Sequence, residues 1–198
     1  LFIAMAGVHQ LWVLDAERGF LFPYAGSGLE ARQDGGLDDS AFAQPSGLAW
    51  HEDTLFVADS ESNVIRAVDL PPVNNVRTLA GGDLFDFGDT DGVGDAVRLQ
   101  HPLAVAYHDG ALYVSDTYNH RIKRLDLGTR RVTAFAGSGK PGLRDGRGAR
   151  ARFYEPGGLA VADGRLLVAD TNNHALRAVD LNSGVVSTVI GPRSPLVV

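Results

Sequence analysis

Short apolar runs alternate along the whole chain with clusters of glycine, proline, aspartate and asparagine. The clearest stretch is Leu166–Asp180, reading LLVADTNNHALRAVD, and it recurs as Leu112–Asp126 and Leu55–Asp69. A weaker copy, Leu1–Asp15, opens the chain, so the first leucines of the four copies are separated by 54, 57 and 54 residues. Self-similarity at a nearly fixed period of this length indicates a repeat architecture.

Each full repeat contains four apolar runs of four to eight residues, and turn-forming residues bound each run. Runs of this kind are typical of β-strands joined by tight turns. They are apolar on both faces, as a sheet packed between two other sheets requires. The expected strands are Gly47–Trp50, Leu55–Ala58, Asn63–Leu70, Val76–Ala80, Leu103–Tyr107, Leu112–Ser115, His120–Leu127, Val132–Ala136, Gly158–Ala162, Leu166–Ala169, Ala175–Leu181 and Val185–Ile190. The pattern predicts an all-β propeller with about four blades of four antiparallel strands.

The four repeats occupy approximately residues 1–44, 45–101, 102–155 and 156–198. We interpret them as one partial propeller domain, because each unit needs its neighbours to bury its apolar faces. The first repeat starts at its second strand, and the final segment, Pro195–Val198, resembles Pro102–Val105 at the start of a first strand. Two arrangements remain open: the tail closes a ring of four blades, or further blades belong to a longer parent chain.

The connections between successive repeats are long and repeat as well. Each connection carries an Asp-Gly pair, which we interpret as a turn, and an apolar residue three positions before a proline. The pairs are Asp34-Gly35, Asp91-Gly92 and Asp145-Gly146, and the apolar residues are Phe42, Leu99 and Phe153. We expect these apolar side chains to act as plugs that hold each connection against the blades.

Composition limits the classes of function. Hydrophobic residues make up 44% of the chain and charged residues 21%, which is typical of an ordinary folded domain. No apolar run approaches the roughly 18 residues that a membrane-spanning helix needs, so we expect no membrane partner. The chain has no cysteine, which excludes disulfides and thiolate metal sites and fits the expected cytoplasmic location.

Charge is distributed unevenly along a chain whose formal net charge is −6. Nucleic acid is therefore not the expected main partner, since phosphate binding relies on lysine and arginine. The stretch Asp83–Asp95 is rich in aspartate, whereas Arg130–Arg152 is rich in arginine and includes Arg144, Arg147 and Arg150. Both stretches lie mainly in the connections, and loops on a rigid scaffold commonly carry function.

The VADTNNH motif at 168–174 and the Pro-Gly-Gly-Leu-Ala motif at 156–160 resemble the NHL repeat. The stretches AMAGVHQLW at 4–12, FAQPSGLA at 42–49, LFVADSES at 55–62 and FGDTDGVGDAVRLQHPL at 87–103 are similar to one subfamily. Members of that subfamily carry a thioredoxin-like domain ahead of the propeller. The resemblance covers essentially the whole chain and implies a six-bladed ring, with that domain and about two blades absent from this chain.

An aspartate closes the second strand in three repeats, at Asp59, Asp116 and Asp170. These carboxylates could form a ring at one mouth of the propeller channel and hold a cation. Alternatively, each aspartate accepts backbone N–H bonds in the turn that follows. Repetition favours the role in the turn, because a single active site needs different residues on different blades.

The turns that follow contain Asn119-His120 and Asn173-His174. Histidines that converge from several blades could ligate Zn²⁺ or Fe²⁺. Some propellers of the NHL type, which this chain resembles, are lyases with a metal ion in the channel. The second repeat, however, has Asn63 at the histidine position. We therefore expect His120 and His174 to pack beneath the turn and to form hydrogen bonds to backbone, rather than to bind a metal.

Two further candidates lie in the connections. Asp89 and Asp91 offer oxygen ligands for Ca²⁺ in a glycine-rich stretch, but the stretch lacks the spacing and terminal glutamate of an EF-hand loop, which favours a solvated acidic loop. The arginine-rich stretch could contact RNA, although RNA binding calls for exposed aromatic residues and only Tyr154 qualifies. It could equally contact an acidic protein surface.

The sequence contains no GxSxG, HExxH or phosphate-loop motif. We therefore expect a protein-interaction or scaffold module without a cofactor, whose partner is a protein. The alternatives are a metal-dependent lyase or hydrolase with its site in the channel, and an RNA-binding face. The candidate interaction face comprises Asp59, Asp116, Asp170, Asn119, His120, Asn173, His174, Arg144, Arg147 and Arg150.

Overall fold

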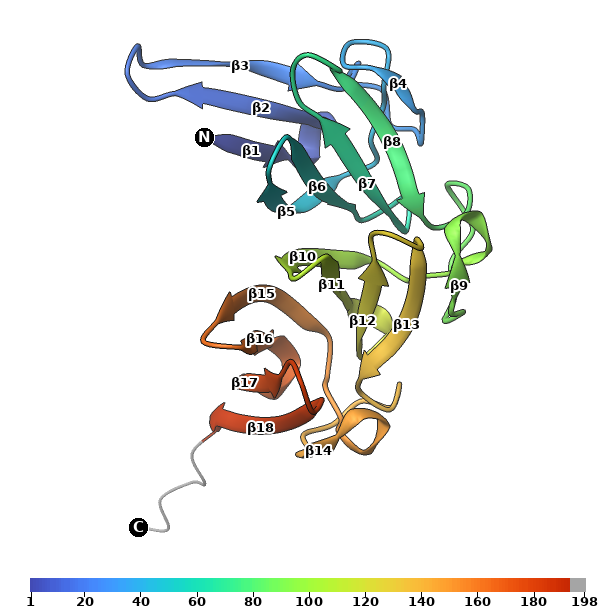
Figure 1. Cartoon of the computed structure of the whole chain (residues 1–198), viewed down its shortest axis with the longest axis vertical. Helices are drawn as coiled ribbons and strands as arrows, with labels where there is room; N and C mark the ends of the chain where they lie inside the picture. The colour runs from blue at the N-terminus through green and yellow to red at the C-terminus, as the bar shows by residue number, and fades with distance from the viewer. Residues whose placement is uncertain (193–198) are drawn as a thin grey trace.

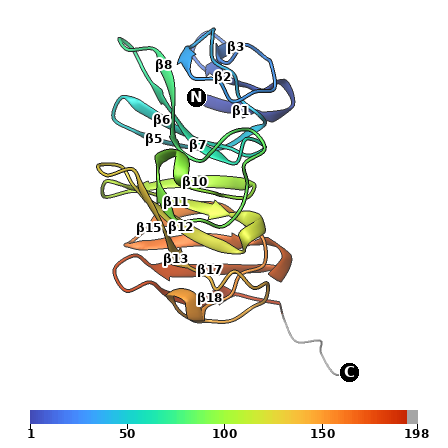
Figure 2. The ribbon, with the colours of Figure 1, turned by 90° about the vertical axis from the view of Figure 1, so that its right-hand side faces the viewer.

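Four antiparallel β-sheets follow one another along an arc in the computed structural model of the chain (Figure 1). The structure describes residues 1–192, so the Pro195–Val198 segment, considered above as a closing strand, lies outside the described residues. Seen from the side, the sheets stack on one another in sequence order (Figure 2). The prediction of an all-β propeller architecture is confirmed, whereas the size of the complete ring remains a prediction.

The first sheet contains β1 (Phe2–Met5), β2 (Gln10–Asp15) and β3 (Phe20–Ala25). The second contains β4 (Gly35–Gly36), β5 (Pro45–His51), β6 (Thr54–Asp59), β7 (Val64–Asp69) and β8 (Asn75–Ala80). The third contains β9 (Gly92–Val93), β10 (Pro102–His108), β11 (Ala111–Asp116), β12 (Arg121–Asp126) and β13 (Arg131–Ala136). The fourth contains β14 (Gly146–Arg147), β15 (Pro156–Ala162), β16 (Arg165–Asp170), β17 (Ala175–Asp180) and β18 (Val185–Ile190).

Helical structure among residues 1–192 consists of five 3₁₀ turns of three residues each. They are η1 (Ala6–Val8), η2 (Gly94–Ala96), η3 (Thr117–Asn119), η4 (Gly148–Arg150) and η5 (Thr171–Asn173). None of the helices in this part of the chain is long and apolar enough to cross a bilayer.

The short strands β4, β9 and β14 correct the expected role of the Asp-Gly pairs. In the structure, the glycine of each pair begins a two-residue strand that joins the outer edge of the next sheet, beside β8, β13 and β18. The aspartate before it accepts a hydrogen bond from the backbone N–H of that outer strand, for example from Thr78 to Asp34 at 2.9 Å. This bond draws the connection back onto the sheet, so each complete sheet has five strands instead of four.

The third strands are also shorter than predicted. Asn63 and His120 were expected to open them, but both residues have left-handed backbone, with φ of 56° and 53°. An extended strand requires negative φ, so β7 and β12 begin one residue later.

The hydrophobic core lies between neighbouring sheets. Phe42 belongs to the cluster between the first and second sheets, Leu99 to that between the second and third, and Phe153 to that between the third and fourth. All three side chains are fully buried. The expectation that these residues plug the connections against the blades matches their position.

The innermost strands approach each other so closely that one position of β5 has no room for a Cβ atom. The strands β5, β10 and β15 lie side by side on the concave side of the arc (Figure 1). A Cβ atom at Gly47 in β5 would lie 2.5 Å from Ala104 Cα and 2.6 Å from the Leu103 carbonyl oxygen. The aligned Gly158 in β15 has 3.9 Å of clearance to Ala169 Cβ.

We therefore expect Gly47→Ala to lower the free energy of unfolding by about 1–3 kcal/mol, because the backbone of β10 must move. Gly158→Ala is the matched control, with an expected change below about 0.5 kcal/mol. Urea unfolding of both variants measures the difference. Equal midpoints for the two variants would contradict the close packing of β5 against β10.

Candidate interaction face

The turns after the second strands and the long connections lie at the same edge of every sheet. Pro45, where a connection ends, pairs with Asp59, where the second strand ends, and the pairs Pro102–Asp116 and Pro156–Asp170 repeat this. We call this edge the loop face. It consists of the turns 60–63, 117–120 and 171–174 and the connections 26–44, 81–101 and 137–155.

The aspartates that close the second strands are buried beneath the loop face. Asp59 Oδ1 accepts the backbone N–H of Ala43 at 2.8 Å, and its Oδ2 accepts the Ser62 hydroxyl at 2.6 Å. Asp116 and Asp170 accept the backbone N–H groups of Gln100 at 2.7 Å and Tyr154 at 2.8 Å. All three are fully buried, so they cannot form an exposed ring of carboxylates. Each ties a turn to the preceding connection.

Asn119 and Asn173 complete the same tie. Asn119 donates to Asp116 Oδ2 at 2.8 Å and to the Gly88 carbonyl oxygen at 2.6 Å. Asn173 donates to Asp170 at 2.8 Å and to the carbonyl oxygen of Gly142 at 3.0 Å. Both amides therefore hold the connection in place, and their donors point into the protein rather than toward a partner.

The histidine position joins one repeat to the next. His120 Nδ1 accepts the backbone N–H of Glu155 at 3.2 Å, and His9 Nδ1 accepts that of Gln44 at 3.3 Å. Asn63 fills the same position, and its Oδ1 accepts the backbone N–H of His101 at 2.8 Å. The Nδ1 atom of His120 is thus used in a hydrogen bond to backbone, as in the hydrogen-bonded alternative. His174 has the same left-handed backbone, with φ of 48°, and is exposed.

Asp89 and Asp91 form ion pairs with a lysine of the same chain. The buried Lys123 ammonium lies 2.5 Å from Asp89 and 2.7 Å from Asp91. Burial lowers the pKa of Lys123, but its hydrogen bonds to the two carboxylates outweigh burial and the pKa is raised overall. Within residues 1–192, no three His, Asp or Glu side chains are arranged to hold a metal ion.

Two buried arginines occupy the corresponding place in the second and fourth sheets. Arg66 lies 3.2 Å from Asp59 and 2.8 Å from Asp34, with its guanidinium 5.1 Å from the Phe42 ring centroid. Arg177 is held in the same way, 2.7 Å from Asp170 and 2.8 Å from Asp145 and 5.2 Å from the centroid of Phe153.

Sequence reasoning missed these three cations. The signal was present, because Arg66, Lys123 and Arg177 stand at the same position of the third strand, and an apolar residue precedes each of them. A repeated charge inside an apolar strand is informative, since charged side chains are rarely fully buried unless they are paired.

Asp116 differs from the other two strand-closing aspartates. Lys123 is shorter than arginine and bonds to Asp89 and Asp91, so Asp116 forms no ion pair with any residue in 1–192. Burial raises the pKa of Asp116 from its ordinary 3.8 to about 7, against the lowering effect of its hydrogen bonds from Gln100 and Asn119.

A raised pKa means that the folded chain binds a proton at Asp116 more tightly than the unfolded chain does. Stability from this group is complete below pH 3.8 and falls as pH rises toward about 7. We expect Asp116→Asn to abolish this pH-dependent loss of unfolding free energy, which is at most about 1.4 kcal/mol per pH unit. Urea unfolding of both proteins from pH 4 to pH 8 tests this, with the exposed Asp163→Asn as control. Parallel stability profiles for the wild type and Asp116→Asn would refute the prediction.

Three arginines of the connection 137–155 face solvent. Arg144, Arg147 and Arg150 are all exposed, and none forms an ion pair with another residue in the described range. Arg144 Nε donates to the Arg150 carbonyl oxygen at 2.5 Å, which fixes the side chain along the loop. Of the predicted face residues, these arginines are the ones that present charge outward.

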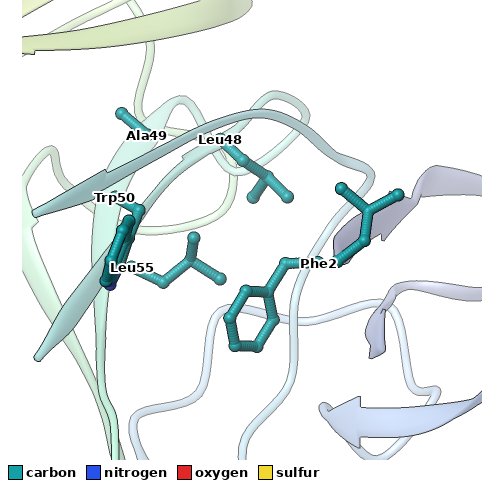
Figure 3. Close-up of a pocket in the computed structure, with 6 residues that line it drawn as sticks. Phe2, Leu48, Ala49, Trp50 and Leu55 are labelled. Atoms are coloured by element: carbon teal, nitrogen blue, oxygen red, sulfur yellow. The ribbon is translucent and has the colours of Figure 1, made fainter. Parts of the chain in front are cut away.

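An apolar pocket of about 380 Å³ lies away from the loop connections, between the first two sheets (Figure 3). Its lining residues are Leu1, Phe2, Leu48, Ala49, Trp50 and Leu55. Phe2 on β1 projects toward Leu48 and Leu55 on β5 and β6 (Figure 3). Among residues 1–192 the first sheet has no strand equivalent to β5, and the pocket lies beside its edge strand β1.

Comparison with known proteins identifies the repeats. The NHL repeat family model matches residues 99–125 and 153–178. The chain is 47% identical over 200 residues to Protein SUPPRESSOR OF QUENCHING 1, chloroplastic, of Arabidopsis thaliana, covering 96% of this chain and 19% of that protein. It is 43% identical over 213 residues to NHL repeat-containing protein 2 of Bos taurus, covering 94% of this chain and 29% of that protein.

The fold also resembles solved structures. A crystal structure of an auxiliary nutrient binding protein from Bacteroides thetaiotaomicron VPI-5482 aligns with a TM-score of 0.73 at 20% sequence identity, covering 94% of this chain and 44% of that chain. At this identity, the likeness concerns the fold alone. The chain spans less than a third of the length of either sequence relative.

Proposed function

This chain belongs to the NHL repeat proteins, and from that premise we propose that it is a protein-interaction module whose partner binds the loop face. The proposal rests on one observation above all. The buried aspartates and cations hold the turns and connections in place, while other side chains of these loops, such as those of Phe87 and Arg147, stay exposed. Rigidly held loops bind partners without a large cost in conformational entropy.

The exposed side chains of the loop face are chemically varied. They include aromatic residues such as Tyr118 and Phe87, and the three arginines of the connection 137–155. Aromatic residues and arginine are enriched at the centre of protein–protein interfaces. This composition supports a protein partner, and the charge of the arginines supports one with an acidic surface.

Site-specific photo-crosslinking tests which face is used. A benzophenone amino acid at Tyr118 or Asn172 reports on the loop face, and one at Asp109 or Asp163 reports on the opposite face, where the first two strands of a sheet are joined. We expect the same protein crosslinks from both loop-face positions and none from the opposite positions. Crosslinks of equal strength from both faces would refute the proposal. Nuclease-sensitive crosslinks would instead support the RNA-binding alternative.

Charge reversal at Arg144, Arg147 and Arg150 tests the acidic-surface component. We expect the triple change to Glu to reduce loop-face crosslinking at least about tenfold, because interfacial like charges repel by several kcal/mol. The exposed Arg131, at the start of β13, provides the control as Arg131→Glu. Unchanged crosslinking by the triple variant would remove the arginines from the interface.

A further inference from the structure

A second pocket, of about 480 Å³, opens on the loop face between the first three sheets. Its lining residues are Glu30, Glu61, Asn63, Leu84, Phe85 and Phe87. They come from three separate segments: the connection 26–44, the turn after β6, and the connection 81–101. Packing of neighbouring blades therefore creates this pocket, which no single segment could form.

Two of its walls are exposed phenylalanine rings. Phe85 is 84% exposed and Phe87 is 62% exposed. The backbone around them is held, since Asp86 N–H donates to the Asp83 carbonyl oxygen at 2.8 Å and Gly88 N–H to that of Leu99 at 3.1 Å. Exposure of two adjacent large rings on an anchored loop is unfavourable for the isolated chain, because burying each one is worth about 1.5–3 kcal/mol. A ligand that covers the rings would gain the free energy of burying them.

The two glutamates that line the pocket, Glu30 and Glu61, have no arginine or lysine partner among residues 1–192. Glu30 and Asp83 form no ion pair with any residue in 1–192, and the Glu61 carboxylate lies 3.2 Å from Nδ1 of His101. In contrast, the neighbouring Asp86 is paired with Arg98 at 3.0 Å. The rim of the pocket therefore carries negative charge that the chain does not neutralise.

We propose that this pocket binds an arginine side chain of a partner peptide, which identifies the partner chemistry for one part of the loop face and so rests on the function proposed above. A guanidinium is planar, stacks on aromatic rings and donates paired hydrogen bonds to carboxylates, whereas lysine offers a compact ammonium. The chain uses the same combination internally. Arg66 lies over Phe42 beside Asp59 and Asp34, and Arg177 repeats this arrangement. The second pocket offers the ring and the carboxylates without the arginine.

The test measures binding of three fluorescein-labelled peptides of sequence Ser-Gly-Leu-Xaa-Leu-Gly-Ser, in which Xaa is Arg, Lys or Gln, by fluorescence polarisation. We expect the Arg peptide to bind most tightly, the Lys peptide less tightly and the Gln peptide not measurably. Binding should weaken as salt rises, because exposed charges are screened.

Two double variants locate the site. Phe85→Ser with Phe87→Ser removes the rings, and Glu30→Gln with Glu61→Gln removes two carboxylates; all four side chains lie at the surface or rim. Each double variant should weaken Arg-peptide binding at least about tenfold, or about 1.4 kcal/mol. Matched controls are Leu143→Ser, an exposed leucine on the following connection, and Glu52→Gln, an exposed carboxylate away from the loop face. Thermal unfolding confirms that all variants remain folded.

Equal affinity for the Arg and Gln peptides, or equal losses in the pocket and control variants, would overturn the arginine site. That outcome together with face-selective crosslinks from Tyr118 and Asn172 would leave the interaction module standing and remove only this pocket. Arg-peptide binding that depends on Phe85 and Phe87, without face-selective crosslinks, would overturn the wider proposal and keep the pocket.

Discussion

Replacing Arg66 or Arg177 by methionine is expected to lower the free energy of unfolding by about 3–5 kcal/mol. Each guanidinium is fully buried and bonds to two carboxylates, one of them fully buried itself. Removing the arginine leaves Asp59 or Asp170 as an uncompensated buried charge. It also leaves backbone carbonyl oxygens without donors, such as Ala41 at 3.0 Å from Arg66 and Arg152 at 3.0 Å from Arg177.

The matched control is Arg77→Met. Arg77 also forms an ion pair, at 2.8 Å from Asp69, but both side chains are partly exposed. Such surface pairs contribute about 0–1 kcal/mol. Urea unfolding at pH 7 compares the variants, and similar midpoints for Arg66→Met and Arg77→Met would show that burial of the pair does not matter.

The double variant Arg66→Met with Asp59→Asn separates the two causes of the loss. If the unpaired charge dominates, the double variant loses less stability than Arg66→Met alone, because the buried position no longer carries a charge. If the lost bonds to backbone dominate, the two changes add.

Truncation of a plug is the second large effect. Phe153→Ala is expected to lower the free energy of unfolding by about 3–5 kcal/mol, because it opens a cavity between the third and fourth sheets. The ring is fully buried and also lies beneath the guanidinium of Arg177. Phe42→Ala should behave in the same way between the first two sheets.

Leucine tests the shape of this site. Leu99 fills the plug position of the third sheet, so Phe153→Leu should cost clearly less than Phe153→Ala. The exposed Phe85→Ala serves as the control, with an expected change below about 0.5 kcal/mol. Equal losses at Phe153 and Phe85 in urea unfolding would contradict the plug role.

The repeat period, the strands and the plugs were readable from the sequence because they depend on local chemistry. Apolar runs of strand length, bounded by turn-forming residues, predict strands wherever they occur. The turn role expected of Asp59, Asp116 and Asp170 was correct only in part. Their carboxylates accept hydrogen bonds from side chains of the turn that follows, but the backbone N–H groups that they accept belong to the preceding connection. Four copies of one pattern then determined the stacked architecture.

Tertiary structure alone decided which partners these local elements take. The Asp-Gly pair looked like a turn, but Asp34 pairs with Arg66, which lies on another strand and is distant in sequence. The sequence also could not show that Lys123 forms ion pairs with Asp89 and Asp91, nor that Asp116 has no ion pair within residues 1–192. Such choices depend on side-chain length and on distances across the sheets, which a linear pattern does not contain.

The same distinction between sequence and tertiary structure applies to the candidate interaction face. The sequence by itself placed the candidate residues in the turns and connections and predicted that they form one face. Only the folded chain shows which of these side chains are consumed by internal bonds, as Asn119 and His120 are, and which remain exposed, as Phe85 does. The physical reason is that burial and pairing arise between segments that meet only when one blade packs against the next.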